Sequence, residues 1–161
     1  MEQKKHKISM TERRKEVLAN LENLGVKIYE QLDKGYFPSI EMPSRSIENI
    51  HYDPQFRQFI LGDRRVRRSA RNIRHLKPFT QLVWAAEFSH ELTSQRKTST
   101  LRDVYYSAQA YEMTFKDQQE SNNIVTDLET VLGFSREDFK IFPEERSAVF
   151  GDLTIEYTVP G

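Results

Sequence analysis

Helix-start signals recur along this 161-residue chain, and each opens a segment whose apolar residues lie three or four positions apart. The first signal, Ser9-Met10-Thr11-Glu12, fits a capping box, in which a hydroxyl and a carboxylate bind the free N–H groups of a first turn. We expect a helix over about residues 11–34, with Gly25 as the position where it could bend. Its inward face is formed by Val17, Leu21, Leu24, Ile28 and Leu32.

Three further helices are expected in the second half of the chain. Pro78 is placed in the first turn of a helix that runs to about Thr93, because proline lacks the N–H that this position leaves unused. Thr100, with Asp103 at the capping-box position, starts a helix that ends near Met113. Asp117 or Ser121 caps the last helix, and Gly133 ends it.

Extended segments are expected between and after these helices. Residues 46–52 and 56–61, separated by Asp53-Pro54, predict a hairpin, whereas a stretch with Pro38 and Pro43 breaks regular structure before it. A second hairpin is expected from residues 148–150 and 153–157. Helix, turn, helix, helix and hairpin is the order of a winged helix-turn-helix. The predicted fold class is mainly α with a small β wing, a CAP-like winged helix-turn-helix domain with an N-terminal helical arm.

The formal net charge of zero conceals a segregation of charge along the chain. Residues 64–108 hold ten Lys or Arg against three Asp or Glu, whereas residues 109–161 hold four basic and eleven acidic residues. A neutral total with a basic centre indicates a local site for a polyanion.

The centre of this basic region is an arginine block, residues 64–74, with six arginines and no intervening acid. These side chains cannot all find carboxylates nearby in the sequence, and phosphate oxygens match a guanidinium bidentately. Such contacts position a duplex without reading its sequence. The alternative is a solvated surface run with weak ion pairs.

A second basic element, residues 96–100, lies in the predicted turn before the helix that Thr100 starts. Free backbone N–H groups and the helix dipole favour anions there, and the hydroxyls of Ser99 and Thr100 add donors. The alternative is an ordinary capped helix start.

Tyr105 and Tyr106 follow Arg102 by three and four residues, so both lie near it on a helix. A phenol has a pKa near 10 and is a poor nucleophile unless its anion is stabilised. Arg102 could stabilise the phenolate of Tyr106 or hold a phosphate as charge builds up. Spacing alone does not separate the two tyrosines, and a tyrosine pair in a helix is commonly core packing.

Other chemistries find little support in the sequence. The absence of cysteine excludes disulfides and thiolate zinc sites, the four histidines are scattered, and no glycine-rich nucleotide loop occurs. Asp127-Leu128-Glu129 is expected on a solvated helix face, so we predict no metal ligands. No apolar run approaches the length of a membrane span, which makes a soluble cytoplasmic, nucleoid-associated protein the expectation.

Residues 97–106 resemble the catalytic segment of the A subunit of topoisomerase VI, in the family of type IIB topoisomerases and meiotic double-strand-break proteins. The similarity extends to residues 38–45, 68–72 and 117–122, and it covers nearly the whole chain from about Arg14 onward. The resemblance implies that Tyr106 attacks the DNA backbone, forms a 5′-phosphotyrosyl link and frees a 3′ hydroxyl.

The resemblance also implies roles for other residues. Arg102 assists at the phosphate, and Tyr105 packs against the protein. The implied contacts to the duplex backbone are Arg67, Arg68, Arg71, Arg96, Lys97, Ser99 and Thr100. The implied function is double-strand passage by an ATP-dependent DNA topoisomerase, with relaxation of supercoils and decatenation.

The resemblance also implies how the chain divides into segments and which partners it binds. Residues 1–13 would form an arm that contacts the ATPase of topoisomerase VI, its B subunit, unless they are a disordered basic tail, and residues 14–158 would form the winged-helix domain. The magnesium-binding Toprim domain of the family would begin where this chain ends, so we expect Mg²⁺ to be bound elsewhere and ATP to be bound by the B subunit. Two A subunits would pair within a heterotetramer on double-stranded DNA, and this chain alone would cut poorly. The rival hypothesis is a non-catalytic winged-helix regulator or scaffold.

Overall fold

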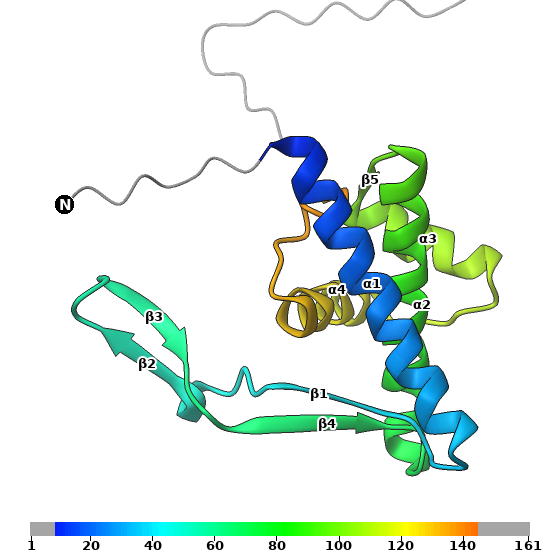
Figure 1. The fold of residues 1–161 in the computed structure, drawn as a ribbon, viewed down its shortest axis with the longest axis horizontal. Helices are drawn as coiled ribbons and strands as arrows, with labels where there is room; N and C mark the ends of the chain where they lie inside the picture. The colour runs from blue at the N-terminus through cyan, green and yellow to red at the C-terminus, as the bar shows by residue number, and fades with distance from the viewer. Residues whose placement is uncertain (1–8, 145–161) are drawn as a thin grey trace, which may run out of the picture.

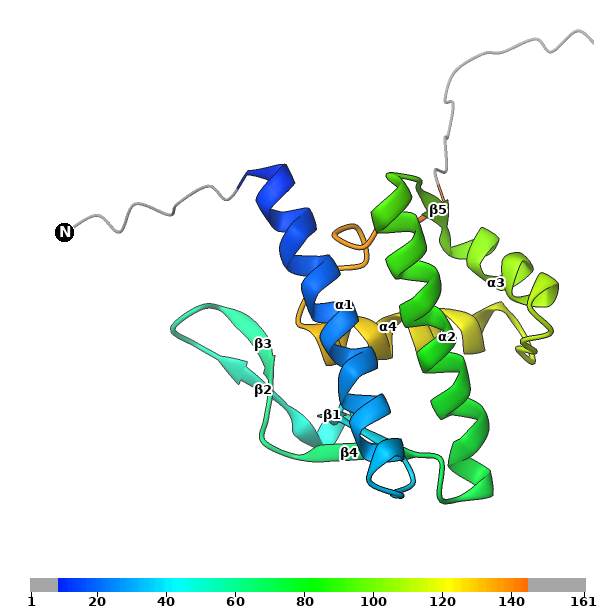
Figure 2. The same cartoon turned by 45° about the vertical axis from the view of Figure 1, so that its right-hand side comes forward.

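The computed structural model describes residues 9–144 and shows two long helices side by side, with a third crossing them (Figures 1 and 2). The elements are α1 (Met10–Asp33), β1 (Ser39–Pro43), the 3₁₀ turn η1 (Ile47–Asn49), β2 (Ile50–Asp53), β3 (Gln58–Leu61), β4 (Arg65–Ser69), α2 (Ile73–Gln95), β5 (Ser99–Thr100), α3 (Leu101–Ala110), α4 (Gln118–Leu132) and β6 (Ile141–Phe142). The predicted mainly α class with small sheets is confirmed. The predicted hairpin over residues 148–157 lies outside the described residues. None of the described helices is long and apolar enough to cross a membrane.

A capping side chain stands at the start of each of the four helices in residues 9–144. Ser9 accepts a hydrogen bond from the Glu12 N–H at 3.2 Å, and Glu12 accepts one from the Ser9 N–H at 2.9 Å, so the predicted capping box of α1 is confirmed. The helix passes Gly25 without interruption. Asp117, and not Ser121, caps α4, and Gly133 ends it in the left-handed conformation at φ 70°.

The predicted start of α2 near Pro78 is wrong. The helix begins at Ile73, because the Asn72 side chain accepts a hydrogen bond from the Arg74 N–H at 2.9 Å and caps it. Pro78 therefore lies inside the helix, where its missing N–H removes one backbone hydrogen bond. The helix that follows Thr100 is also shorter than expected, since α3 ends at Ala110.

The core lies where α1, α2, α4 and β1 meet. Fully buried apolar side chains from each of them meet there, including Val17, Met42, Leu82, Val125 and Leu128. α3 adds Val104 and Ala108, which are buried and anchor it beside α4. α3 is thus held through one face and its other face is open.

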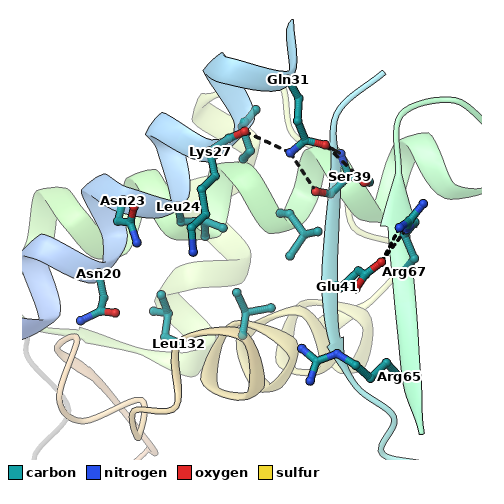
Figure 3. Close-up of a pocket in the computed structure, with 13 residues that line it drawn as sticks. Asn20, Asn23, Leu24, Lys27, Gln31, Ser39, Glu41, Arg65, Arg67 and Leu132 are labelled. Carbon is teal, nitrogen blue, oxygen red and sulfur yellow. Dashed lines mark hydrogen bonds and ion pairs between the residues drawn. The ribbon is translucent and has the colours of Figure 1, made fainter. Parts of the chain in front are cut away.

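The stretch around Pro38 and Pro43 is a strand, which corrects the expectation of irregular structure. β1 pairs antiparallel with β4, the strand that the arginine block forms. The prolines are compatible with a strand because Pro38 precedes it and Pro43 is its last residue. The free edge of β1 is covered at Ser39, where the Gln31 amide accepts from the Ser39 N–H at 3.0 Å and donates to its C=O at 3.2 Å (Figure 3).

The predicted hairpin near residue 54 is confirmed with shorter strands, as β2 pairs antiparallel with β3. Tyr52 and Phe59 face each other across it with ring centroids 5.4 Å apart. The hairpin projects away from the helices (Figure 1).

Asp127 does not lie on a solvated helix face, contrary to expectation. It is buried beneath the β1–β4 ribbon, where its carboxylate binds Arg45 and accepts a hydrogen bond from Arg68 at 2.8 Å. Glu129 is also paired, with Arg136 at 2.6 Å. The arginines that bind Asp127 are 59 and 82 residues away in the chain, so no local pattern indicates these pairs.

We predict that Asp127→Ala lowers the free energy of unfolding by about 3 kcal/mol, because it leaves two partly buried guanidinium groups without their shared carboxylate. Glu48→Ala is the matched control, since the Arg64–Glu48 pair is exposed on both sides and should contribute less than about 1 kcal/mol. Equilibrium urea unfolding measures both values. Equal losses in the two variants would contradict the structural role of Asp127.

Candidate functional site

The start of α3 is held by a capping box. The Asp103 N–H donates to the Thr100 hydroxyl at 3.1 Å, and the Asp103 carboxylate accepts from the Thr100 hydroxyl at 2.8 Å and from its N–H at 3.3 Å. Ser99 is buried, and its hydroxyl donates to the Thr100 C=O at 3.3 Å. Both hydroxyls are engaged within the protein, so they fix the helix start and do not present free donors to solvent.

A short parallel bridge ties this helix start to the end of the described chain. β5 pairs with β6, and the Ser99 N–H donates to the Lys140 C=O at 2.9 Å. Asp138 fixes the turn that carries Lys140, because its carboxylate accepts two hydrogen bonds from the Arg13 guanidinium, at 2.9 and 3.1 Å. α1, β5 and the turn before β6 therefore form one connected support for α3.

Tyr106 lies on the open face of α3 with about half of its surface (51%) exposed. The guanidinium carbon of Arg102 lies 5.8 Å from the Tyr106 ring centroid. The Tyr106 hydroxyl first, and the Glu144 carboxylate second, raise the pKa of Arg102 above its ordinary value. Arg102 and Tyr106 therefore present a cation and a phenolic oxygen together at the surface.

The geometry distinguishes the two tyrosines that spacing alone could not. Tyr105 is half-buried and lines a hollow near the C-terminal end of α3 with Gln109 and Met113. Its ring lies 5.4 Å from that of Tyr106 at 65°, edge to face. Only Tyr106 has the Arg102 guanidinium over its ring among the described residues.

Glu144 is a residue of this site that the sequence did not reveal. Its carboxylate lies 4.0 Å from the Arg102 Nε, and the Arg102 side chain is more than half exposed. A phosphate bound at Arg102 would compete with this carboxylate for the same guanidinium. The arrangement can therefore hold an anion beside an exposed phenol, with an internal carboxylate in the anion's place when none is bound.

The arginine block is only partly free to bind an anion. Arg64 pairs with Glu48 at 2.6 Å, Arg67 binds Glu41, and Arg68 binds Asp127 at 2.8 Å. The hydrogen bond from Arg67, reinforced by the charge of Arg65, lowers the pKa of Glu41. Three other arginines of the block, Arg65, Arg71 and Arg74, are exposed and form no ion pair within residues 9–144.

Two of the block's arginines border a groove between α1 and the β1–β4 ribbon (Figure 3). The groove has a volume of about 470 Å³ and an apolar floor that includes Leu24 and Leu132. Its rim carries Lys27, Arg65 and the paired Arg67.

The structure does not bring the two basic elements together. The arginine block lies at the N-terminal end of α2, whereas Arg96 and Lys97 lie at its C-terminal end (Figures 1 and 2). A helix of 23 residues separates them by about 33 Å. Arg96 and Lys97 are exposed and lie at the end of the molecule where α3 begins.

The described residues do not fit a metal ion of their own. Within residues 9–144 there is no group of three or more His, Asp or Glu side chains placed to hold one.

Comparison with known proteins gives consistent matches. The family described as Type IIB DNA topoisomerase matches residues 77–141, which include α3. The chain is 42% identical over 144 residues to the A subunit of a type 2 DNA topoisomerase 6 from Methanothermobacter thermautotrophicus, covering 88% of this chain and 41% of that protein. Proteins of the same name from Pyrococcus abyssi and Halobacterium salinarum are each 36% identical, with 87% and 93% of this chain covered and 38% and 41% of theirs. The chain thus spans about two fifths of the length of the curated relatives that it matches.

We predict that Asp138→Asn reduces stability near neutral pH and that the difference from the wild type shrinks in acid. The hydrogen bonds from Arg13 lower the pKa of Asp138 despite its partial burial, so its stabilisation is complete above the unfolded value of about 3.9 and is lost as the pH falls from there through the lowered folded value. Urea unfolding at pH 7 and at about pH 3 measures this, with Glu137→Gln as the exposed neighbouring control. A difference that does not change with pH would contradict the role of the Arg13–Asp138 pair.

Proposed function

The chain belongs to the type IIB DNA topoisomerase family, and from this membership together with its surface tyrosine we propose that it is the DNA-binding and DNA-cleaving domain of an A subunit. The observation that carries the proposal is the half-exposed phenol of Tyr106 beside the Arg102 guanidinium on a capped helix. A buried Tyr106 would have no access to a DNA backbone.

In the proposed reaction the Tyr106 oxygen attacks a backbone phosphorus. The bond from phosphorus to the tyrosine oxygen forms as the bond to the 3′ oxygen breaks, the phenol releases its proton, and the 3′ oxygen takes one up. One ester replaces another, so the break can be resealed by the reverse step without a further energy source. Arg102 stabilises the charge on the non-bridging phosphate oxygens, displacing Glu144 as it does so.

Arg67, Arg71, Arg96 and Lys97 are the proposed contacts to the duplex backbone. Arg68, Ser99 and Thr100, which the resemblance also implicates, support the site by holding β4 and the start of α3. The two ends of α2 are about 33 Å apart, close to one turn of B-form DNA. A duplex therefore needs about ten base pairs to reach both ends.

The complete enzyme that we propose contains more than this chain. It would relax and decatenate double-stranded DNA as a heterotetramer, with two A subunits paired and ATP held by the B subunits, in the cytoplasm at the nucleoid. Mg²⁺ would be held by a Toprim domain, as the resemblance to the family implies. The chemistry of this chain's own residues is to bind the duplex and to supply the nucleophile.

We predict that Tyr106→Phe abolishes covalent attachment to DNA, because it removes the only proposed nucleophilic oxygen. Tyr105→Phe is the matched control, since Tyr105 is half-buried and should leave attachment intact. The measurement incubates the chain with supercoiled DNA, Mg²⁺, the ATPase partner and a Toprim domain added in trans, then denatures the mixture and scores protein bound to 5′ ends.

Two results would overturn the assignment. Attachment that survives Tyr106→Phe would place the nucleophile elsewhere. DNA binding without attachment in any variant, with every component present, would support the non-catalytic regulator instead.

We predict that Glu144→Gln tightens binding of the chain to a 20-base-pair duplex by up to about fivefold, because a partly exposed carboxylate no longer competes for Arg102. Fluorescence anisotropy at fixed salt measures the Kd. Glu112→Gln makes the same charge change near the other end of α3 and should have a smaller effect. Equal effects would show that Glu144 acts only through net charge.

A further inference from the structure

A basic hollow lies beside the start of α3, separate from Tyr106 and from the arginine block. It has a volume of about 370 Å³. Its lining comes from the first turns of α1, the α2–β5 loop and the turn before β6, namely Met10, Thr11, Arg14, Arg96, Thr98 and Lys140. Three of these six side chains are cations and two carry hydroxyls, and no carboxylate belongs to the lining in the described part of the chain.

The first cation, Arg14, is held in place. Its guanidinium donates to the C=O of Thr93 at 2.8 Å and to the C=O of Ser94 at 2.7 Å, which are among the last carbonyls of α2. These bonds satisfy groups that a helix end leaves free, and they use two of the five N–H donors of the arginine. The charge of Arg14 is thus fixed at the wall of the hollow before any ligand arrives.

The other two cations are carried by strained backbone. Arg96 and Lys140 have φ values of 58° and 71°, in the left-handed region that disfavours a residue with a Cβ. Arg96 is the C-cap of α2, whereas the equivalent position of α4 is Gly133, the residue that this conformation prefers. α2 thus ends in a long cation where α4 ends in glycine, so the left-handed C-cap of α2 places a positive charge at the wall of the hollow.

The hollow is also rigidly connected to the tyrosine site. The Lys140 C=O accepts the Ser99 N–H at 2.9 Å, and Thr98 lines both this hollow and the next one, which is bordered by Thr100 and Asp103 at the start of α3. Eight residue-to-residue steps lead from Thr98 to Tyr106, three of them extended and five helical, so the two Cα atoms are at most about 18 Å apart. That distance corresponds to about five base pairs of a duplex.

We propose that Arg14, Arg96 and Lys140 form a phosphodiester-binding pocket that holds the DNA backbone within about five base pairs of the bond that Tyr106 attacks. The pocket rests on the proposed function, because it assigns a second anchoring point to the same duplex. It fixes the position of the strand relative to Tyr106, whereas Arg102 acts at the reacting phosphate itself. Arg14 and Lys140 are thereby added to the DNA contacts.

The test replaces both strained cations with the residue that their backbone prefers, in the variant Arg96→Gly/Lys140→Gly. The Kd for a labelled 20-base-pair duplex is measured from about 50 to 300 mM KCl with the full chain. Loss of two phosphate contacts should reduce the slope of log K against log salt by about 1.8. The urea midpoint should stay the same or rise, because glycine relieves the left-handed strain.

Two further variants make the result decisive. Arg96→Gln/Lys140→Gln removes the charges and keeps the side-chain bulk, so it should reduce the slope equally even if the glycine variant folds poorly. Lys34→Gln/Lys116→Gln makes the same charge change at exposed positions outside the hollow and should reduce it by less than half as much.

The outcomes separate this proposal from the one on which it rests. A wild-type chain that binds the duplex, together with pocket variants whose slope equals that of the wild type or of the lysine control, overturns the pocket alone. A wild-type chain that does not bind the duplex overturns the proposed function and the pocket with it. A slope lowered by about 1.8 in both pocket variants and retained in the control supports the pocket, whereas a loss of about 0.9, the share of Arg96 alone, overturns it.

Discussion

The backbone hydrogen bond from Ser99 to Lys140 is the contact on which the arrangement of the site depends. It joins Ser99, two positions before α3, to a turn that Arg13 holds through Asp138, so the helix carrying Tyr106 is connected to the first turn of α1. The Thr100–Asp103 capping box then sets the direction of the helix from that point. Because only Val104 and Ala108 of α3 are buried, the opposite face can expose Tyr106 without loss of core contacts.

Charge counting along the chain located the basic region but did not show that carboxylates pair with part of it. In the arginine block, Arg64, Arg67 and Arg68 are neutralised by carboxylates from three different elements. Arg68 in particular meets the buried Asp127, where its role is to attach the β1–β4 ribbon to α4. A run of arginines therefore indicates that anions bind there, but some of these anions can be carboxylates of the same protein that are distant in the sequence.

Sequence patterns predicted the helix ends that are set by hydrogen bonds between nearby residues. The caps at Ser9, Thr100 and Asp117 and the stop at Gly133 are set by bonds within four residues. The sequence predicted each of them, although it left Ser121 open as an alternative to Asp117. The start of α2 was missed because Pro78 was placed in the first turn, whereas the actual cap is Asn72. The β1–β4 pairing, the Asp127 ion pairs and the Arg14–Lys140 hollow join residues far apart in the chain, so no spacing rule could find them.

The ion pairs show where the acidic residues of the second half of the chain lie relative to its arginines. Four acidic residues from the second half of the chain, Asp127, Glu129, Asp138 and Glu144, each face an arginine in space. Among the described residues, this acidic segment pairs with only three members of the basic region, namely Arg68, Lys77 and Arg102. At the α3 end of the described chain, Arg96, Lys97 and Lys140 form no ion pair with residues 9–144. Within residues 9–144, positive charge is therefore left without an ion pair at the end of the molecule where α3 begins, the end at which the proposed reaction would need to hold a phosphate diester.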